Sequence, residues 1–342
     1  MTTHSPEQAF AVDDVTHRVE AMYSLFPYPS QNRREKRLTE LANLLRLFAA
    51  ENSFDFNGMR VLDVGTGTGH RLVTAARLFP GAQFTAVDLA AAPLEIARAT
   101  AEEAGVSNVE FVQHDIMSDR TDLGRFDVVL CMGVLHHLAD PEVGLRHLAK
   151  LVSDDGVLFA YVYGAIGSAE RMRRKEMLSL LLGADRGHFD AGLRMASALG
   201  FDSLNFGWNR NADDAASIDS LIVDSYMNVN ETLFDISGVA DLIRGSGLDS
   251  FMTYGITTDA RGYLFDTDLH PRSPYAVQWT DMRRFLPGEE AVAAYERLTL
   301  RERYRLVELA YQPNGITVLG WRDAAAHRFS SNGRVKRNAI SP

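Results

Sequence analysis

The glycine-rich turn that follows Val61–Val64 constrains the fold of this chain more than any other segment. A strand-like run leads directly into alternating glycines at positions 65, 67 and 69, and the amphipathic segment RLVTAARLF follows. A strand, a glycine turn and a helix start in this order are typical of a nucleotide pocket at the carboxyl edge of a parallel sheet. Glycine suits such a turn because it accepts positive φ and lets a ligand approach the backbone closely.

The spacing of these glycines separates the turn from the dinucleotide-binding motif. That motif reads G-x-G-x-x-G and wraps a pyrophosphate, whereas this chain reads G-x-G-x-G and carries Asp63 just before the first glycine. An acid inside the loop would repel a pyrophosphate but suits a ligand with positive charge. The pattern therefore argues against a nicotinamide oxidoreductase, which is retained only as an alternative.

Two later apolar runs also end in acids. Residues 84–88 are apolar on both sides, as a buried parallel strand is, and end in Asp88, which can hold both ribose hydroxyls of a nucleoside. Residues 109–113 lead to Asp115. The alternative for Asp88 is an N-cap of the next helix. For Asp115, loop capping carries about equal weight.

These segments, together with the strand-like 126–131 and the Met132–Pro141 stretch after it, resemble class I S-adenosylmethionine-dependent methyltransferases of the small-molecule branch. The resemblance covers residues 55 to 165. It implies an α/β, Rossmann-like fold with a seven-stranded, mostly parallel sheet, helices on both faces and a terminal antiparallel hairpin formed by 251–257 and 315–321. It also implies S-adenosylmethionine as cofactor, with these contacts: Asp63, Gly65, Thr66, Gly67, Gly69, Asp88, Leu89, His114, Asp115, Ile116, Met132 and Gly133.

The composition of the chain limits the classes of partner that it is expected to bind. The net charge of −10 argues against nucleic acid, whose partners usually carry a basic footprint, and the basic cluster 171–175 resembles the solvated face of a helix. No apolar run approaches the ~20 residues that span a bilayer, and residues 1–14 are polar and acidic, so we expect no signal peptide there. The single cysteine, Cys131, lies in an apolar strand and fits a buried thiol in a reducing cytoplasm. No metal-binding constellation stands out.

The chain is longer than a minimal fold of this kind requires. Helices are predicted at 12–22 and 37–50, before the core, and the segments after the fifth strand (156–163) suggest insertions. The expected division is an N-terminal helical lid (1–54), a cofactor-binding core (55–164), a cap insertion (165–235), completion of the core (236–323) with an insertion at 258–313, and a flexible tail (324–342).

Two segments outside the core are candidates for the acceptor site. Tyr23, Phe26 and Tyr28 lie in a stretch with two prolines that resembles a lid motif of some bacterial methyltransferases; ordinary packing on the sheet edge is the alternative. The second segment places polar groups in an apolar context, and helix capping or turn chemistry explains it nearly as well. Its candidates for catalysis or substrate contact are Asp224, Tyr226 and Asn228.

Methyl transfer from a sulfonium is an in-line displacement, which requires alignment and the exclusion of water. A base is needed only when the acceptor loses a proton. His136 or His137, just after the fourth strand, suits that role; the alternative is that one lines the adenosine pocket and the other caps a helix. We expect methyl transfer to a small molecule, and the sequence also allows a homodimer formed through a cap.

Two other functions for the same cofactor stay open. Attack at another carbon of the sulfonium, by aminocarboxypropyl transfer or by cyclisation, would release methylthioadenosine. A binding module that holds the cofactor without chemistry is the other alternative.

Overall fold

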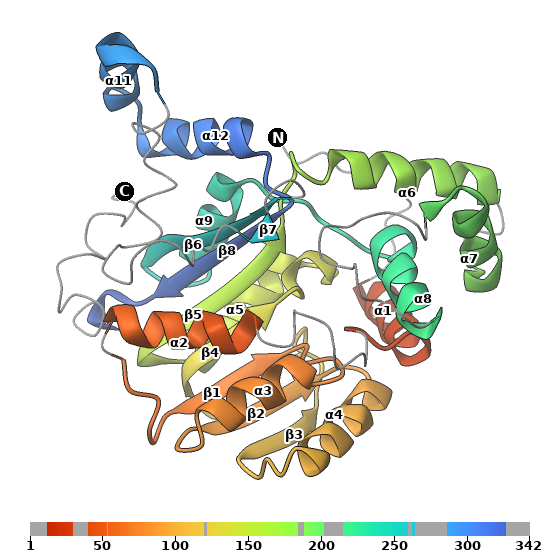
Figure 1. The fold of residues 1–342 in the computed structure, drawn as a ribbon. Coiled ribbons are helices and arrows are strands. Elements are labelled where there is room, and N and C mark those ends of the chain that lie inside the picture. The colour runs from red at the N-terminus through yellow and green to blue at the C-terminus, as the bar shows by residue number, and fades with distance from the viewer. Residues whose placement is uncertain are drawn as a thin grey trace.

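The computed structural model of the chain describes residues 12–29, 40–52, 54–119, 122–183, 188–201, 215–258, 262–263 and 286–325. A mixed sheet with the order β3-β2-β1-β4-β5-β8-β6-β7 forms its centre (Figure 1). The strands are Arg60–Val64 (β1), Gln83–Asp88 (β2), Val109–Gln113 (β3), Phe126–Met132 (β4), Val152–Tyr163 (β5), Ser250–Thr258 (β6), Gly262–Tyr263 (β7) and Gly315–Trp321 (β8). The helices that surround them are α1 (Val12–Leu25), α2 (Glu40–Asn52), α3 (His70–Leu78), α4 (Ala91–Glu103), α5 (Pro141–Leu151), α6 (Ala169–Leu182), α7 (Phe189–Ala198), α8 (Ala215–Ile222), α9 (Ile236–Gly245), α11 (Gly288–Glu296) and α12 (Leu300–Tyr311).

The sheet confirms the predicted Rossmann-like fold. β1 to β5 pair in parallel, whereas β8 runs antiparallel to both of its neighbours, β5 and β6. Without the two-residue edge strand β7, the order corresponds to the seven-stranded arrangement expected from the resemblance. The carboxyl ends of β1, β2, β4 and β5 therefore meet at one edge, where ligands bind in folds of this type.

The strands of the sheet are apolar on both faces because helices cover both. Val61 on β1 and Val128 on β4 belong to the core that contains α2 and α3, while the adjacent Leu62 and Val129 belong to the core that contains α5, α9 and α12. Successive side chains of a strand point to opposite faces, so each strand contributes to both cores. This layering explains the lack of apolar–polar alternation in the sequence.

The ends of several elements differ slightly from the predictions. β5 begins at Val152, directly after α5, instead of at residue 156. Arg322 stabilises this abrupt junction, since its guanidinium donates to the carbonyls of Ala149 at 2.7 Å and Val152 at 2.9 Å. In the N-terminal region, α1 continues to Leu25, so Tyr23 is helical and not part of an extended segment.

A group of helices that we call the cap lies beyond the carboxyl edge of the sheet. It consists of α6, α7, α8 and a π-helical turn, Val223–Met227. The cap has a small core of its own, with Leu178, Ile222 and Tyr226 among its buried members. The N-terminal segment contacts this cap, because the Phe26 ring packs edge-to-face on Phe189 of α7 at 5.1 Å.

The division into lid, core, caps and tail stays a prediction. Residues 326–342 of the tail and much of the 258–313 insertion lie outside the described residues. Among the helices that the structure describes, none combines the length and the apolar character needed to cross a membrane.

Candidate active site

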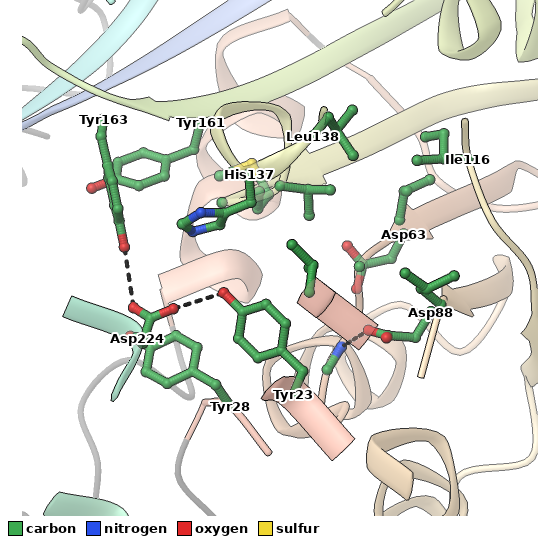
Figure 2. A pocket seen from close by; sticks show the side chains of 18 of the residues that line it. Tyr23, Tyr28, Asp63, Asp88, Ile116, His137, Leu138, Tyr161, Tyr163 and Asp224 are labelled. Atoms are coloured by element: carbon green, nitrogen blue, oxygen red, sulfur yellow. Dashed lines mark hydrogen bonds between the residues drawn. The ribbon is translucent and has the colours of Figure 1, made fainter. Parts of the chain in front are cut away.

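A pocket of about 410 Å³ opens at the carboxyl ends of the central strands and reaches under α1 and the cap. Figure 2 shows Asp63 and Asp88 on one side and Asp224, with Tyr23 and Tyr163, on the other. We call these the glycine-turn end and the cap end. The residues predicted from the sequence that line it are Tyr23, Tyr28, Asp63, Gly65, Gly67, Asp88, Leu89, His114, Asp115, Ile116, Met132, Gly133, His137 and Asp224.

All three glycines of the turn have the positive φ that the sequence suggested: 65° at Gly65, 56° at Gly67 and 71° at Gly69. Their missing side chains also make room for neighbours. A Cβ on Gly67 would lie 2.0 Å from the Tyr28 carbonyl oxygen, and one on Gly65 would lie 2.2 Å from a methyl of Val134. The turn is therefore held between the N-terminal segment and the loop after β4.

The N-terminal segment binds this turn through its backbone. The Tyr28 carbonyl accepts from the Thr68 amide at 3.3 Å, and the Pro29 carbonyl accepts from the Thr68 hydroxyl at 2.8 Å. The backbone of Tyr28 therefore lies on the glycine turn, and Tyr23 precedes it by five residues, on α1. This contact brings the aromatic segment to the pocket.

Asp88 at the end of β2 connects the glycine turn to the helix after it. One carboxylate oxygen accepts from the Gly67 amide at 2.7 Å, and the other accepts from the Ala90 amide at 3.0 Å. Burial raises the pKa of Asp88, and these amides oppose that rise. Each oxygen retains a lone pair, because one accepted bond does not exhaust a carboxylate oxygen. Asp88 is thus placed to bind a pair of hydroxyl groups.

Asp63 lies buried beneath the turn, at the end of β1. Burial raises its pKa to about 6, against the opposing effects of Thr66 and the nearby charge of Arg71. Arg71 in the first turn of α3 lines the same end of the pocket. Within the described residues, no hydrogen bond or ion pair uses its guanidinium. This end of the pocket therefore offers both a carboxylate and a free cation.

Asp115 performs the loop-capping role that was one of its two interpretations. Its carboxylate accepts from the Met117 amide at 2.8 Å and closes the turn after β3. The residue also lines the pocket, as do Ile116 and His114 beside it. Capping and ligand contact are thus compatible, since the capped oxygen is one of two.

At the cap end, Asp224 joins three separate elements. Its carboxylate accepts from the Tyr23 hydroxyl of α1 at 2.8 Å and from the Tyr163 hydroxyl of β5 at 3.3 Å (Figure 2). Asn228 donates to the Tyr23 hydroxyl at 3.1 Å. Burial and the charge of Asp224 raise the pKa of both tyrosines well above the usual value. Both phenols therefore stay protonated donors at neutral pH.

Of the two adjacent histidines, only His137 reaches the pocket. Its Nδ1 lies 3.0 Å from the Asn230 carbonyl, which can only accept, so Nδ1 carries the proton and Nε2 keeps a lone pair. Burial lowers the pKa of His137, although the charges of Asp224 and Glu231 oppose this. Within the described residues Nε2 has no hydrogen-bond partner. The geometry provides a neutral imidazole with a free basic nitrogen.

His136 lies beneath the pocket wall and not on it. Its ring stacks on Tyr163 with the centroids 3.8 Å apart and an angle of 25° between the planes. Burial lowers its pKa well below the usual value. His136 thus supports the Tyr163 ring and has no route to a substrate in this arrangement.

The basic cluster 171–175 is only in part the solvated helix face predicted from its sequence, since Arg173 is exposed but two other members face inward. Arg171 binds the buried Glu231 through both terminal nitrogens and donates to the Ser225 carbonyl at 3.1 Å. Lys175 binds the same carboxylate at 3.2 Å. Burial opposes ionisation of Glu231, but the charges of Lys175 and Arg171 lower its pKa to about 2. Arg171 and Lys175 face inward because they bind a buried acid that lies 56 to 60 residues away along the chain.

Five more predicted residues do not line the pocket. The Thr66 amide binds the Val87 carbonyl, Gly69 packs on Ala97, and Phe26 packs on the cap. Asn228 reaches the cap end only through Tyr23. Tyr226 packs against Phe201 at 5.0 Å in the core of the cap, so this geometry offers no support for its predicted catalytic role.

Several residues that line the pocket were not predicted from the sequence. Tyr161 and Tyr163 alternate along β5 and so point to the same side of the sheet, a signal that was present in GVLFAYVY. Arg71 lies in the first turn of an amphipathic helix and Arg171 in a polar helix, where the sequence does not distinguish them from ordinary surface residues. For these two arginines, only the position of the helix relative to the pocket reveals a role.

Replacing Gly67 with alanine should destabilise the protein more than positive φ alone explains. A left-handed non-glycine residue costs about 1–2 kcal/mol, and the clash with Tyr28 should add about 1–3 kcal/mol. Urea unfolding measures both. Gly105→Ala is the matched control, because Gly105 has φ 65° and a Cβ added there would meet nothing within 4 Å. Equal losses in the two variants would show that Tyr28 does not rest on the turn.

Parts of this chain are similar in sequence to known proteins. Residues 55–177 match a family model described as a methyltransferase domain. An uncharacterized protein from Synechococcus sp. is 29% identical over 314 residues, which cover 87% of this chain and 69% of that protein. The ubiquinone biosynthesis O-methyltransferase of Erwinia tasmaniensis is 41% identical over 120 residues, 34% of this chain and 48% of that enzyme. The match thus spans about half the length of the enzyme.

Among solved structures, PKMT2 from Rickettsia typhi in complex with AdoHcy has a TM-score of 0.59 and 18% identity, covering 86% of this chain and 55% of that chain. At this identity the likeness extends to the fold alone. The family match and the sheet order coincide over the segments that carry the glycine turn and Asp88. The chain therefore contains a methyltransferase domain of the S-adenosylmethionine-dependent class, formed by residues 55–177.

Proposed function

We propose that the chain transfers a methyl group from S-adenosylmethionine to a small molecule bound in the same pocket. The observation that carries the proposal is that one continuous pocket extends from Asp88 to Asp224 and is lined by residues of α1 and the cap. Its volume of about 410 Å³ is in the range of small-molecule sites. The O-methyltransferase of ubiquinone biosynthesis named above makes a small acceptor a reasonable class.

The residues of the glycine-turn end fit the cofactor. The free lone pairs of Asp88 suit the ribose hydroxyls. Asp115 and Ile116 suit the adenine, as the resemblance implies. Asp63 is placed to attract the ammonium of the methionine moiety, and Arg71 to bind its carboxylate. These pairs match charges of opposite sign, which stabilise a buried ligand.

The cofactor supplies a methyl group that its sulfonium charge has already activated. The residues of the chain then orient the acceptor and exclude water, a task that suits Tyr23 and Tyr28 on the roof of the pocket. His137 accepts a proton at Nε2 when the acceptor must lose one. Its hydrogen bond to the Asn230 carbonyl holds the ring in the required tautomer.

Isotope-labelled methyl transfer tests the proposal. Enzyme and S-adenosylmethionine with a labelled methyl group are incubated with separate small-molecule and macromolecular fractions of a cell extract. We expect label in the small-molecule fraction and S-adenosylhomocysteine as the nucleoside product. Release of methylthioadenosine would overturn methyl transfer, and label confined to macromolecules would overturn the small acceptor. An absence of turnover with intact cofactor binding would favour a binding module.

Asp88→Ala should weaken binding of S-adenosylhomocysteine by about 1.5–3 kcal/mol, the usual contribution of hydrogen bonds to a charged group. Isothermal titration calorimetry measures the loss. Glu110→Ala on the neighbouring β3 is the control, since Glu110 is exposed and does not line the pocket. Unchanged affinity in a folded Asp88→Ala variant would remove the ribose assignment.

His137 should titrate below its usual pKa of about 6.5, because burial disfavours the imidazolium. A lowered pKa means that the ring is neutral at pH 7 and gains its proton only as the pH falls further. Nitrogen-detected NMR of labelled imidazoles should show the Nδ1–H tautomer at pH 7, with His137→Gln providing the assignment. A pKa above 6.5 or an Nε2–H tautomer would contradict the role as a base.

A further inference from the structure

The carboxylate of Asp224 is buried without a cation. The residue is 3% exposed and lines the pocket, and it has no ion-pair partner in the part of the chain that the structure describes. Its bonds to the hydroxyls of Tyr23 and Tyr163 are from neutral donors. A buried anion is costly unless an opposite charge accompanies it. Each oxygen accepts one bond and retains a lone pair for a ligand.

The cations nearest to this carboxylate are engaged elsewhere. Arg171 and Lys175 both bind Glu231, and Arg171 also donates to the Ser225 carbonyl. Arg171 also interacts with Asp224 electrostatically. Burial lowers the pKa of Arg171, whereas the charge of Glu231, followed by Tyr163 and Asp224, raises it. Its fork of donors nevertheless points to Glu231. Among the described residues, therefore, no cationic side chain contacts the Asp224 carboxylate at the cap end.

Aromatic rings surround the same end of the pocket. Tyr23, Tyr28, Tyr161 and Tyr163 all line it (Figure 2). The face of an aromatic ring attracts cations, most strongly where water is excluded. A carboxylate among tyrosine rings is therefore a site for a positively charged group, and it disfavours an anionic acceptor such as a phenolate or a carboxylate.

We propose that the acceptor is an amine that enters the pocket as its ammonium ion and is bound there by Asp224. The proposal rests on the proposed function and assigns the substrate class of the same site. His137 removes one proton from the ammonium through Nε2 and later releases it to water. The freed nitrogen lone pair forms the new N–C bond as the S–C bond of the donor breaks, and that electron pair remains on sulfur. The methylated amine leaves as a cation.

Asp224 has a second function in this scheme. Its charge favours the imidazolium that forms on His137, since it opposes the effect of burial on the pKa of that ring. The carboxylate therefore binds the incoming cation and also stabilises the proton after transfer. Tyr23 and Tyr163 hold the carboxylate in place through their hydroxyls, one from the lid helix and one from the sheet.

Matched ligands test the charge preference directly. The protein is saturated with S-adenosylhomocysteine. Ligand-observed NMR then compares the binding of small primary and secondary amines with that of the alcohol and the carboxylate of the same carbon skeleton. One such set is phenethylamine, phenethyl alcohol and phenylacetate. We expect amines to bind about tenfold or more tightly than their alcohols, and the carboxylates to bind most weakly. Asp224→Asn should abolish the preference.

Asp219→Asn is the control variant, because it makes the same change on α8 at a residue that does not line the pocket. It should keep the wild-type preference. The amine assignment would be overturned if amines and alcohols bound equally, if the carboxylates bound more strongly, or if no amine bound. It would also be overturned if the preference survived in Asp224→Asn. Binding of S-adenosylhomocysteine in the same samples reports on the cofactor site, so its loss identifies a failure of the proposed function instead.

Discussion

The glycine turn between β1 and α3 connects the parts of this protein on which the pocket depends. The Gly67 amide binds the Asp88 carboxylate, which joins the ends of β1 and β2. The space beside Gly67 receives the Tyr28 carbonyl, which brings the N-terminal segment over the sheet edge. The space beside Gly65 receives Val134 from the loop after β4. A side chain at either glycine would separate elements that must meet for the pocket to close.

A second junction at Asp224 closes the other end. The hydroxyls of Tyr23 and Tyr163 bring α1 and β5 to one carboxylate on the cap, while Glu231 gathers Arg171 and Lys175 nearby. The two acids and the two cations carry equal and opposite charge, but both cations contact Glu231 and neither contacts Asp224. This asymmetry gives the cap end its local negative character. The geometry of the cap, more than its composition, therefore shapes the proposed acceptor site.

Prediction from the sequence was most successful where the pattern reflects the backbone itself. Buried parallel strands are apolar on both faces, and a turn with positive φ requires glycine, so the sheet and the turn could be inferred from local residues. Prediction failed where side-chain direction mattered. Tyr226 lies two residues after Asp224, and positions i and i+2 of a helix do not share a face, so one faces the pocket and the other the core of the cap. Arg171 was misjudged because the partner that buries it, Glu231, is distant in sequence.

The amino-acid sequence by itself determined the class of fold, the glycine turn and the acids at the strand ends, since short-range sterics and burial dictate all three. Only the tertiary structure decided which of two adjacent histidines faces the pocket, that Arg71 lies beside Asp63 at the glycine-turn end, and that Asp224 meets two tyrosines from distant parts of the chain. These features depend on contacts between residues up to 201 positions apart. No local pattern records such contacts, because they arise only when α1, the sheet and the cap pack together.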